Sequence, residues 1–123
     1  MEWLAVFIGG GVGSIARYAT GISCALLCGK NFPYGTLVVN VIGSFLILFF
    51  MTIAVERLTV SPAIRLLVVT GFLGGFTTFS SFAFETLSLA INGESIKAVL
   101  NLFLTVIAGF AAGMGGIMAA RML

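Results

Sequence analysis

One hydrophobic stretch of the chain carries glycines and hydroxyl groups of a kind that can handle ions. Residues 70–82 read TGFLGGFTTFSSF, with three glycines and five hydroxyl side chains among thirteen residues. Glycine inside a helix costs about 1 kcal/mol relative to alanine, so the Gly74-Gly75 pair followed by Thr77-Thr78 predicts a break in the helix. A break at membrane depth frees carbonyl and N–H groups that must line a cavity or find a partner. Because transporters hold ions at unwound backbone of this kind, the stretch is the first candidate for an ion site.

The same stretch has a second interpretation that involves no ion. Its glycines would then allow close helix packing, and its phenylalanines would face lipid. Phe79 and Phe82 lie three residues apart, so their rings share one face if the helix resumes after the break. Residues elsewhere in the chain have to distinguish the two interpretations.

One amide, Asn40, stands inside an otherwise apolar segment, and an amide surrounded by hydrocarbon needs a hydrogen-bond partner. A hydrogen bond to another helix is one solution, worth about 0.6 kcal/mol on average in membranes. Donation from the Asn40 NH₂ group to a passing anion is the other solution. Thr36 lies one turn earlier on the same helix face and would stand beside that path.

Arg17 lies in the middle of the first hydrophobic segment, where a charged side chain is costly and marks a functional site by default. Its long side chain can instead reach the membrane surface and keep its charged end in water. The functional alternative is that Arg17 faces an aqueous vestibule and attracts anions.

The last hydrophobic segment carries a stripe of polar and small residues. Asn101, Thr105 and Gly109 recur every four residues and so share one helix face. Gly109 and Gly113 have the small-xxx-small spacing that lets helices approach closely. The stripe is therefore either a packing surface or the wall of a pore.

These residues belong to a chain whose composition requires a membrane. Of its 123 residues, 60 % are hydrophobic and 8 % are charged, whereas soluble domains carry about 25 % charged residues. A span takes about 20 apolar residues, which predicts four transmembrane helices at about 3–27, 36–55, 63–91 and 97–120. The first lacks a basic leader region and is expected to be a permanent span and not a signal peptide. We expect an all-α integral membrane protein with one four-helix transmembrane domain, residues 1–123, whose third helix is broken at its centre.

The composition also excludes several functions. A net charge of +2 gives no basic patch for nucleic acid, and the absence of histidine removes the commonest metal ligand and general base. The glycines at 9–13 do not form a dinucleotide-binding loop, because no strand precedes them and no acidic residue follows at the required distance. Gly9 and Gly13 instead have the small-xxx-small spacing. Cys24 and Cys28 lack a third metal ligand nearby and are expected to pack as small apolar residues. No covalent chemistry is indicated, so we expect no enzyme and no catalytic residue.

Loop cations normally orient a membrane protein, but here they give almost no bias. Arg57, Arg65 and Arg121 fall on one side of the predicted membrane, and Lys30 and Lys97 fall on the other. A chain without bias can insert in both orientations, and the natural product is an antiparallel dimer. Four helices rich in small residues pack too tightly to enclose a channel, so we expect any pore to be shared between subunits.

Over essentially its whole length the chain resembles the Fluc (CrcB) family of small fluoride channels. The resemblance rests on GSIARY at residues 13–18, on GTLVVN at 35–40 and on the string at 70–82 that leads to Glu85. The last string is highly specific, whereas the asparagine and the arginine alone would be weak signals.

The resemblance implies a dual-topology homodimer with two antiparallel fluoride pores and a structural Na⁺ at the dimer centre. Asn40 would be a fluoride ligand, and Phe79 and Phe82 would form an aromatic box whose electropositive ring edges face the anion. The Na⁺ would bind the backbone carbonyls of Gly74 and Thr77 from both subunits. The other residues that the resemblance places near the pore are Thr36, Ser80, Ser81 and, in a polar track of the fourth span, Thr105.

The residue pattern and the resemblance agree on passive transport. Amide, hydroxyl and ring-edge donors can replace the water around fluoride without a fixed cation that would trap it, and conduction requires weak, multiple sites. We expect passive export of fluoride by a multi-pass protein of the inner (plasma) membrane, with fluoride, a second copy of the chain and lipid as its partners. Gly109 departs from the polar track, which in the family carries a polar residue there.

Two rival functions remain at this stage. A small proton-coupled drug exporter of the four-helix dual-topology type is the alternative, and it needs a carboxylate inside the membrane. Glu2 and Glu56 lie at span ends, so only Glu85 qualifies. An assembly or scaffold subunit is the other rival, for which the stretch at 70–82 would be unusually polar.

Overall fold

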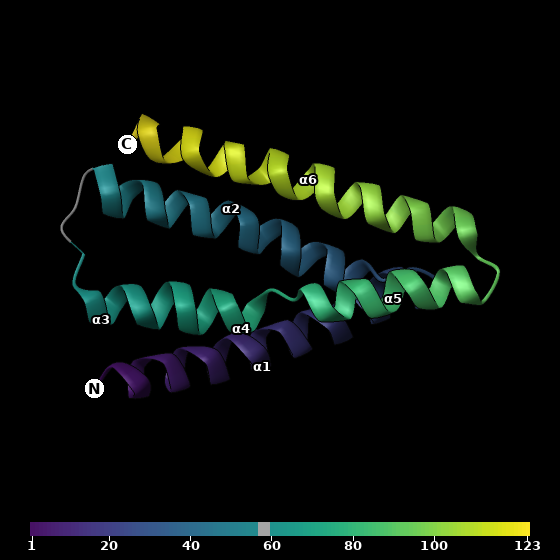
Figure 1. Ribbon diagram of the computed structural model, residues 1–123, viewed down its shortest axis with the longest axis horizontal. Helices are drawn as coiled ribbons and strands as arrows, with labels where there is room; N and C mark the ends of the chain where they lie inside the picture. Colours follow the sequence, from purple (N-terminus) through teal and green to yellow (C-terminus); the bar gives the residue numbers. More distant parts are fainter. Residues whose placement is uncertain (57–59) are drawn as a thin grey trace.

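The computed structural model describes residues 1–56 and 60–123, which are helical apart from short connections (Figure 1). Within these ranges there is no β-strand. Three spans are single helices: α1 (Glu2–Cys28), α2 (Tyr34–Glu56) and α6 (Ser95–Met122). The third span consists of α3 (Pro62–Arg65), the π-helical η1 (Leu66–Leu73), α4 (Gly74–Phe76) and α5 (Phe79–Ile91).

The all-α membrane class expected from the composition is confirmed. Among the described residues, four helical segments are long and apolar enough to cross a bilayer, and their ends differ from the predicted bounds by at most two residues. The chain is therefore a multi-pass membrane protein. Arg57, which entered the predicted charge balance, lies outside the described residues.

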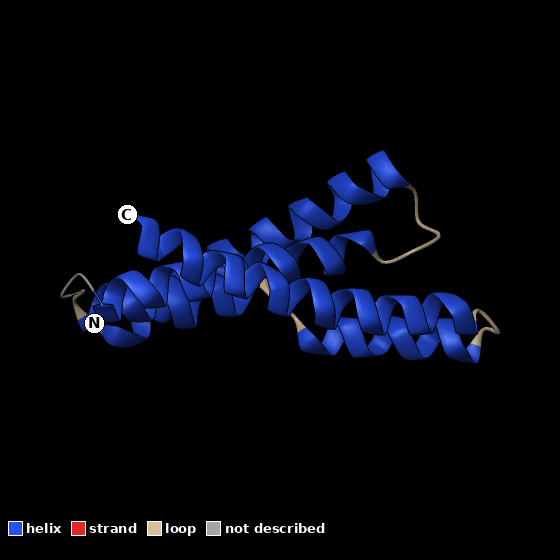
Figure 2. Cartoon of the chain, turned by 90° about the horizontal axis from the view of Figure 1, so that it is seen from above, coloured by secondary structure: helices blue, strands red, loops and turns tan. Residues whose placement is uncertain are grey.

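The helices form an elongated bundle in which the third span lies between α1 and the pair formed by α2 and α6. Both termini lie at one end, and the connections at 29–33 and 92–94 lie at the other (Figure 1). α2 packs along α6, α1 packs against η1 and α4, and α5 packs against α6. Towards the two connections the helices separate into two arms (Figure 2).

Capping residues explain where several helices begin and end. The Ser61 hydroxyl accepts from the N–H of Ile64 at 3.3 Å, with Pro62 at the first helical position, which confirms the predicted start of the third span. Gly93 follows the last residues of α5 and has a φ of 82°, in the left-handed region that favours glycine. Gly29 has the same φ and follows the last residue of α1.

The break in the third span lies at Thr77 and Thr78 and not at the glycine pair. Their φ/ψ angles are −84°/159° and −154°/120°, which are extended, whereas Gly74 and Gly75 are helical. β-branched residues fit extended backbone well. The Thr78 hydroxyl also caps α5 by accepting from the N–H of Ser81 at 3.2 Å. The predicted break is therefore confirmed, but the glycines do not make it.

Glycines of α1 and of the third span bring the backbones of these two segments together. A Cβ atom at Gly13 would stand 2.1 Å from the carbonyl oxygen of Phe72, and one at Gly75 would stand 2.5 Å from the carbonyl oxygen of Gly10. Only glycine allows this approach, so the packing interpretation is right for Gly75, whereas a Cβ on Gly74 would meet only the Val69 carbonyl oxygen, at 3.7 Å. Gly9 and Gly13 are both buried, as their spacing predicted.

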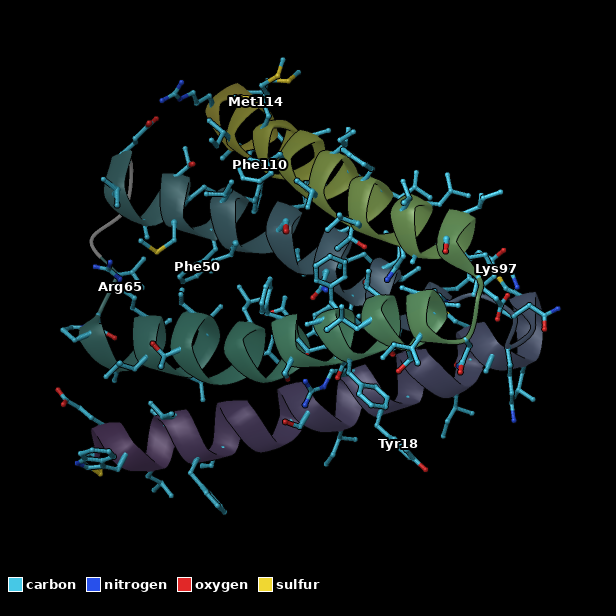
Figure 3. The ribbon with its side chains drawn as sticks, turned by 45° about the vertical axis from the view of Figure 1, so that its right-hand side comes forward. Tyr18, Phe50, Arg65, Lys97, Phe110 and Met114 are labelled. Carbon is cyan, nitrogen blue, oxygen red and sulfur yellow. The ribbon has the colours of Figure 1, made fainter. Side chains whose placement is uncertain are left out.

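Ion pairs lie at both ends of the bundle. Arg121 pairs with Glu56 at 2.7 Å and joins α6 to α2, and Lys97 pairs with Glu94 at the other end. Figure 3 shows Arg65 and Lys97 at opposite ends of the molecule. Cationic side chains therefore occur at both ends, as expected from the sequence.

Candidate functional site

Asn40 on α2 pairs with the unwound backbone at the break. Its Nδ2 donates to the carbonyl oxygen of Thr78 at 3.0 Å, and its Oδ1 accepts from the N–H of Thr78 at 2.8 Å. A side-chain amide can match a peptide group in this way because each offers a donor and an acceptor. The interhelical hydrogen bond considered for Asn40 therefore exists, and it is made to backbone freed by the break.

These contacts release two carbonyl groups from their helical partners. In a continuous α-helix, the N–H groups of residues 78 and 81 would donate to the carbonyls of Gly74 and Thr77. Here the Thr78 N–H donates to Asn40, and the Ser81 N–H donates to the Thr78 hydroxyl. The two carbonyls expected to hold a cation are thus the two whose α-helical donors are taken by side chains.

A groove with a volume of about 590 Å³ lies beside the break, between α2, the third span and α6. Six of the predicted site residues line it: Asn40, Gly74, Thr77, Phe79, Phe82 and Thr105. Most of the other lining side chains are apolar. The fold therefore gathers polar groups from distant parts of the sequence at one largely apolar surface.

Phe79 and Phe82 form an edge-to-face pair at this groove. Their ring centroids are 5.8 Å apart and their planes meet at 63°, so the predicted shared face is confirmed. Phe82 is 6 % exposed, whereas Phe79 is 80 % exposed. The edges of such rings carry partial positive charge and can face an anion. Phe82 is thus held in the interior of the chain, and Phe79 is free to meet an ion or another subunit.

Thr36 and Glu85 form a separate polar pair away from the groove. The Thr36 hydroxyl donates to Glu85 Oε1 at 2.9 Å, and Oε2 is buried with no hydrogen-bond partner among the described residues. Glu85 also lines a second cavity of about 360 Å³, which Lys30 and Lys97 border between the connections at 29–33 and 92–94. The structure therefore places Thr36 towards that end of the molecule and not beside the break.

The polar stripe of α6 serves partly as a packing surface and partly as the wall of the groove. Asn101 is fully buried, and its Nδ2 donates to the Thr86 hydroxyl at 2.8 Å, which joins α6 to α5. Thr105 is 9 % exposed, and in the described part of the chain its hydroxyl has no hydrogen-bond partner. Thr105 and Gly109 both line the groove. Asn101 is thus packing surface, and the next two positions are groove wall.

Besides Thr36, three predicted site residues do not line the groove. The Ser80 hydroxyl lies 3.4 Å from the Thr78 hydroxyl, and Ser81 contributes its N–H to the cap of α5. Arg17 is partly buried on α1 and makes no hydrogen bond or ion pair with a described residue. Its neighbour Tyr18 points away from the bundle (Figure 3). The predicted vestibule role of Arg17 stays a prediction.

Sequence reasoning did not single out Thr78 or Ser44. Thr78 stands three residues before Ser81, the spacing of a helix cap, and that spacing is a usable signal. Ser44 follows Asn40 by one turn and donates to the Asn40 carbonyl at 2.7 Å. Glu85 was noted only as a carboxylate within a span, and its partner Thr36 is identified by the fold alone.

The chain matches the family model described as "CrcB-like protein, Camphor Resistance (CrcB)" over residues 4–117. It is 44 % identical to the fluoride-specific ion channel FluC of Sulfurihydrogenibium sp. (strain YO3AOP1), over 99 % of this chain and 98 % of the relative. It is 46 % identical to proteins of the same name from two other organisms. These are Roseiflexus sp. (strain RS-1), over 95 % and 91 % of the two chains, and Geobacter sulfurreducens (strain ATCC 51573 / DSM 12127 / PCA), over 98 % and 97 %. The matched region covers most of each of the four spans and includes the break and the groove, so the chain belongs to the CrcB-like family.

Proposed function

We propose that this chain is a fluoride-selective channel that lets fluoride leave the cell passively across the inner (plasma) membrane. Relatives that match it over nearly their whole length are named fluoride-specific ion channels. The observation that carries the proposal is the groove beside the break, where an amide, hydroxyls and phenylalanine rings meet on an apolar surface. Such a protein transports an ion and is not an enzyme.

Fluoride is small and strongly hydrated, so its path needs a donor at each step. The Asn40 amide has two hydrogens, and one of them is engaged by the Thr78 carbonyl, which leaves the second for the ion. Thr105 offers a hydroxyl without a partner in the described chain. Phe79 and Phe82 offer ring edges. None of these groups carries a full positive charge, so none would trap the ion.

Four residues outside the groove have supporting places in the proposed path. Thr36 bonds to Glu85, which lines the second cavity, and its hydroxyl would lie near the point where fluoride enters or leaves. Ser80 and Ser81 lie at the start of α5, just past the break, and would add hydroxyls near the path. Arg17 carries a full charge that no described residue neutralises, so it would raise the local concentration of anions in a vestibule.

The carbonyl oxygens released at the break are suitable ligands for a structural Na⁺. The carbonyls of Gly74 and Thr77 have lost their α-helical donors to side chains. Neutral oxygens from two copies of the chain suit a monovalent ion better than Mg²⁺, which keeps its waters. In residues 1–56 and 60–123, no group of three or more histidine, cysteine or acidic side chains offers a charged alternative. The ion would supply positive charge between carbonyl dipoles that otherwise repel one another.

Two copies in antiparallel orientation would complete the pores. Phe79 is 80 % exposed at the groove in the single chain, and a second copy would cover it. Cations at both ends give no strong preference for one orientation. We therefore propose a dual-topology homodimer with two pores, in which each groove faces the partner.

Labelling of Cys28 tests the dual topology. Cys28 is exposed at the end of α1, and Cys24 is partly buried. In a Cys24→Ser background, a membrane-impermeant thiol reagent added outside intact cells should label about half of the Cys28 population. Labelling of all or none of it would show a single orientation and would contradict the proposed assembly.

Release from liposomes tests the function itself. The purified chain is reconstituted in vesicles loaded with equal amounts of potassium fluoride and potassium chloride, and valinomycin is added to carry the counter-charge. A passive channel releases fluoride to an external electrode with no proton gradient and leaves chloride inside. Release that requires a proton gradient would favour an exporter acting through Glu85, and equal release of chloride would contradict fluoride selectivity.

A further inference from the structure

The groove wall on α6 loses its polar side chain one turn beyond Thr105. Thr105 is 9 % exposed, lines the groove and has a hydroxyl that no described residue engages. The next position on the same face is Gly109, which also lines the groove but has no side chain to offer. An ion that leaves Thr105 along this wall therefore meets no donor on α6 at the next turn.

A hydroxyl from the neighbouring helix borders the space that a side chain of Gly109 would take. A Cβ atom built on Gly109 would lie 3.5 Å from Ser44 Oγ and would meet no other atom within 4 Å. Ser44 is on α2, one turn beyond Asn40, and it lines the same groove. Asn40, Ser44 and Thr105 are thus three polar side chains on one wall region formed by α2 and α6.

We propose that Ser44 is a further fluoride-binding residue and continues the path past Thr105 where α6 has only Gly109. The proposal rests on the proposed function of the groove as a fluoride path. It assigns to α2 two successive donors, Asn40 and Ser44, and it explains how the path tolerates a glycine on α6. No covalent step is involved, because the ion only exchanges hydrogen-bond donors.

The Ser44 hydroxyl must turn to reach the ion. It now donates its single hydrogen to the Asn40 carbonyl at 2.7 Å. That carbonyl is also the α-helical acceptor for the Ser44 N–H, so it keeps a partner when the hydroxyl rotates away. A hydrogen bond to an anion is stronger than one to a neutral carbonyl, so an arriving fluoride favours the rotation, and the carbonyl takes the hydroxyl back when the ion leaves.

A purely structural role is the competing explanation, since serine and threonine commonly bond back to the carbonyl four residues earlier. Thr52 on the same helix does so with the Leu48 carbonyl at 2.7 Å, and it is not a groove residue. Thr52→Ala is therefore a matched control that removes an equivalent backbone contact of α2 away from the path.

The experiment compares Ser44→Ala, Gly109→Ser, the double variant and Thr52→Ala as full-length protein in fluoride-loaded liposomes. Ser44→Ala should lower the initial rate of fluoride release roughly tenfold or more, the usual effect of one lost hydrogen bond to a charged group. Thr52→Ala should release fluoride within about twofold of the unmodified chain. Gly109→Ser puts a hydroxyl on α6 in the same space, so the double variant should recover most of the lost rate.

Recovery is the outcome that a structural role would not produce, because a serine at position 109 cannot restore a bond to the Asn40 carbonyl made by residue 44. Unchanged release by Ser44→Ala would overturn the assignment, as would a double variant that elutes like the unmodified protein yet stays slow. If Ser44→Ala fails to fold, Ser44→Cys keeps the shape with a weak donor and should be slow for the same reason. Failure of the unmodified chain to release fluoride would instead overturn the proposed function, which separates the two results.

Discussion

The side-chain amide of Asn40 forms two hydrogen bonds with a single residue, donating to the Thr78 carbonyl at 3.0 Å and accepting from the Thr78 N–H at 2.8 Å. This pairing fastens α2 to the break in the third span. It also withdraws the donor that would occupy the Gly74 carbonyl in a continuous helix. One amide thus bears on both proposed ion sites, because it frees an oxygen for a cation and keeps one hydrogen for an anion.

Two replacements of Asn40 should distinguish loss of its hydrogen bonds from the effect of a negative charge beside the fluoride path. Asn40→Asp keeps the acceptor for the Thr78 N–H but sets a carboxylate oxygen against the Thr78 carbonyl and adds negative charge at the groove. Asn40→Ser loses both bonds but adds no charge. Each variant should be less stable by about 1–3 kcal/mol, and fluoride release should be slower for aspartate than for serine. Unmodified release rates for the aspartate variant, measured in liposomes beside thermal unfolding, would refute the assignment of Asn40 to the path.

Phe79 and Phe82 should each be required for conduction, although they differ in burial. Replacement by isoleucine keeps an apolar side chain but removes the ring edge that faces the anion. Phe79→Ile should leave the stability of the single chain nearly unchanged because the ring is 80 % exposed, whereas Phe82→Ile replaces a ring that is only 6 % exposed and should lower stability.

Both variants should nevertheless elute as dimers and conduct fluoride severely below the unmodified rate. Phe103→Ile is the control, because Phe103 is 57 % exposed on α6 and lines neither cavity. If all three variants conduct fluoride at the unmodified rate, the two rings at the groove serve only in packing, and the polar residues of α2 and α6 must form the path alone.

The close approach of α1 and the third span makes a sharp prediction for stability. A Cβ at Gly13 would stand 2.1 Å from the Phe72 carbonyl oxygen, whereas a Cβ at Gly11 would meet nothing within 4 Å. Gly13→Ala should therefore destabilise the protein by about 1–3 kcal/mol through overpacking. Gly11→Ala should be neutral or stabilising by up to about 1 kcal/mol, because alanine favours the helix. Equal unfolding temperatures for the two variants in detergent would contradict this packing.

Hydrophobicity was sufficient to predict the four spans, which follow from apolar runs of the required length. The glycine pair drew the predicted break towards itself, although the break lies at Thr77 and Thr78. Glycine does weaken a helix, but here the backbone contact that Gly75 makes with α1 outweighs that cost. That contact joins residues far apart in the sequence, so it cannot be predicted from the residues next to Gly75.

The sequence predicted which residues belong to the candidate site better than it predicted their hydrogen-bond partners. The spacing of Phe79 and Phe82 placed both rings on one face, and the isolation of Asn40 in hydrocarbon showed that it needs a partner. Which backbone group it meets depends on how α2 lies against the break, and the same is true of Thr36 with Glu85 and Ser44 with Gly109. These pairs join residues that only the folded chain brings together.

Removal of sodium should inactivate the channel slowly, because the proposed ion is structural and lies between two subunits. Dimers held in sodium-free buffer should lose fluoride conduction over time. Relative to its own lower starting rate, Asn40→Ala should lose conduction faster, since the Thr78 N–H is then free to return to the Gly74 carbonyl. An inward sodium gradient should not drive fluoride uptake into vesicles, and uptake that follows such a gradient would show sodium to be a transported ion.

The most direct test of the fluoride channel is the reversal potential of the current that the purified chain carries across a planar bilayer. With a tenfold fluoride gradient and equal chloride on both sides, the current should reverse at about 59 mV, the equilibrium value for one monovalent ion. An added pH gradient should leave that potential unchanged. A reversal potential near zero, or one that moves with the pH gradient, would contradict passive and selective conduction of fluoride.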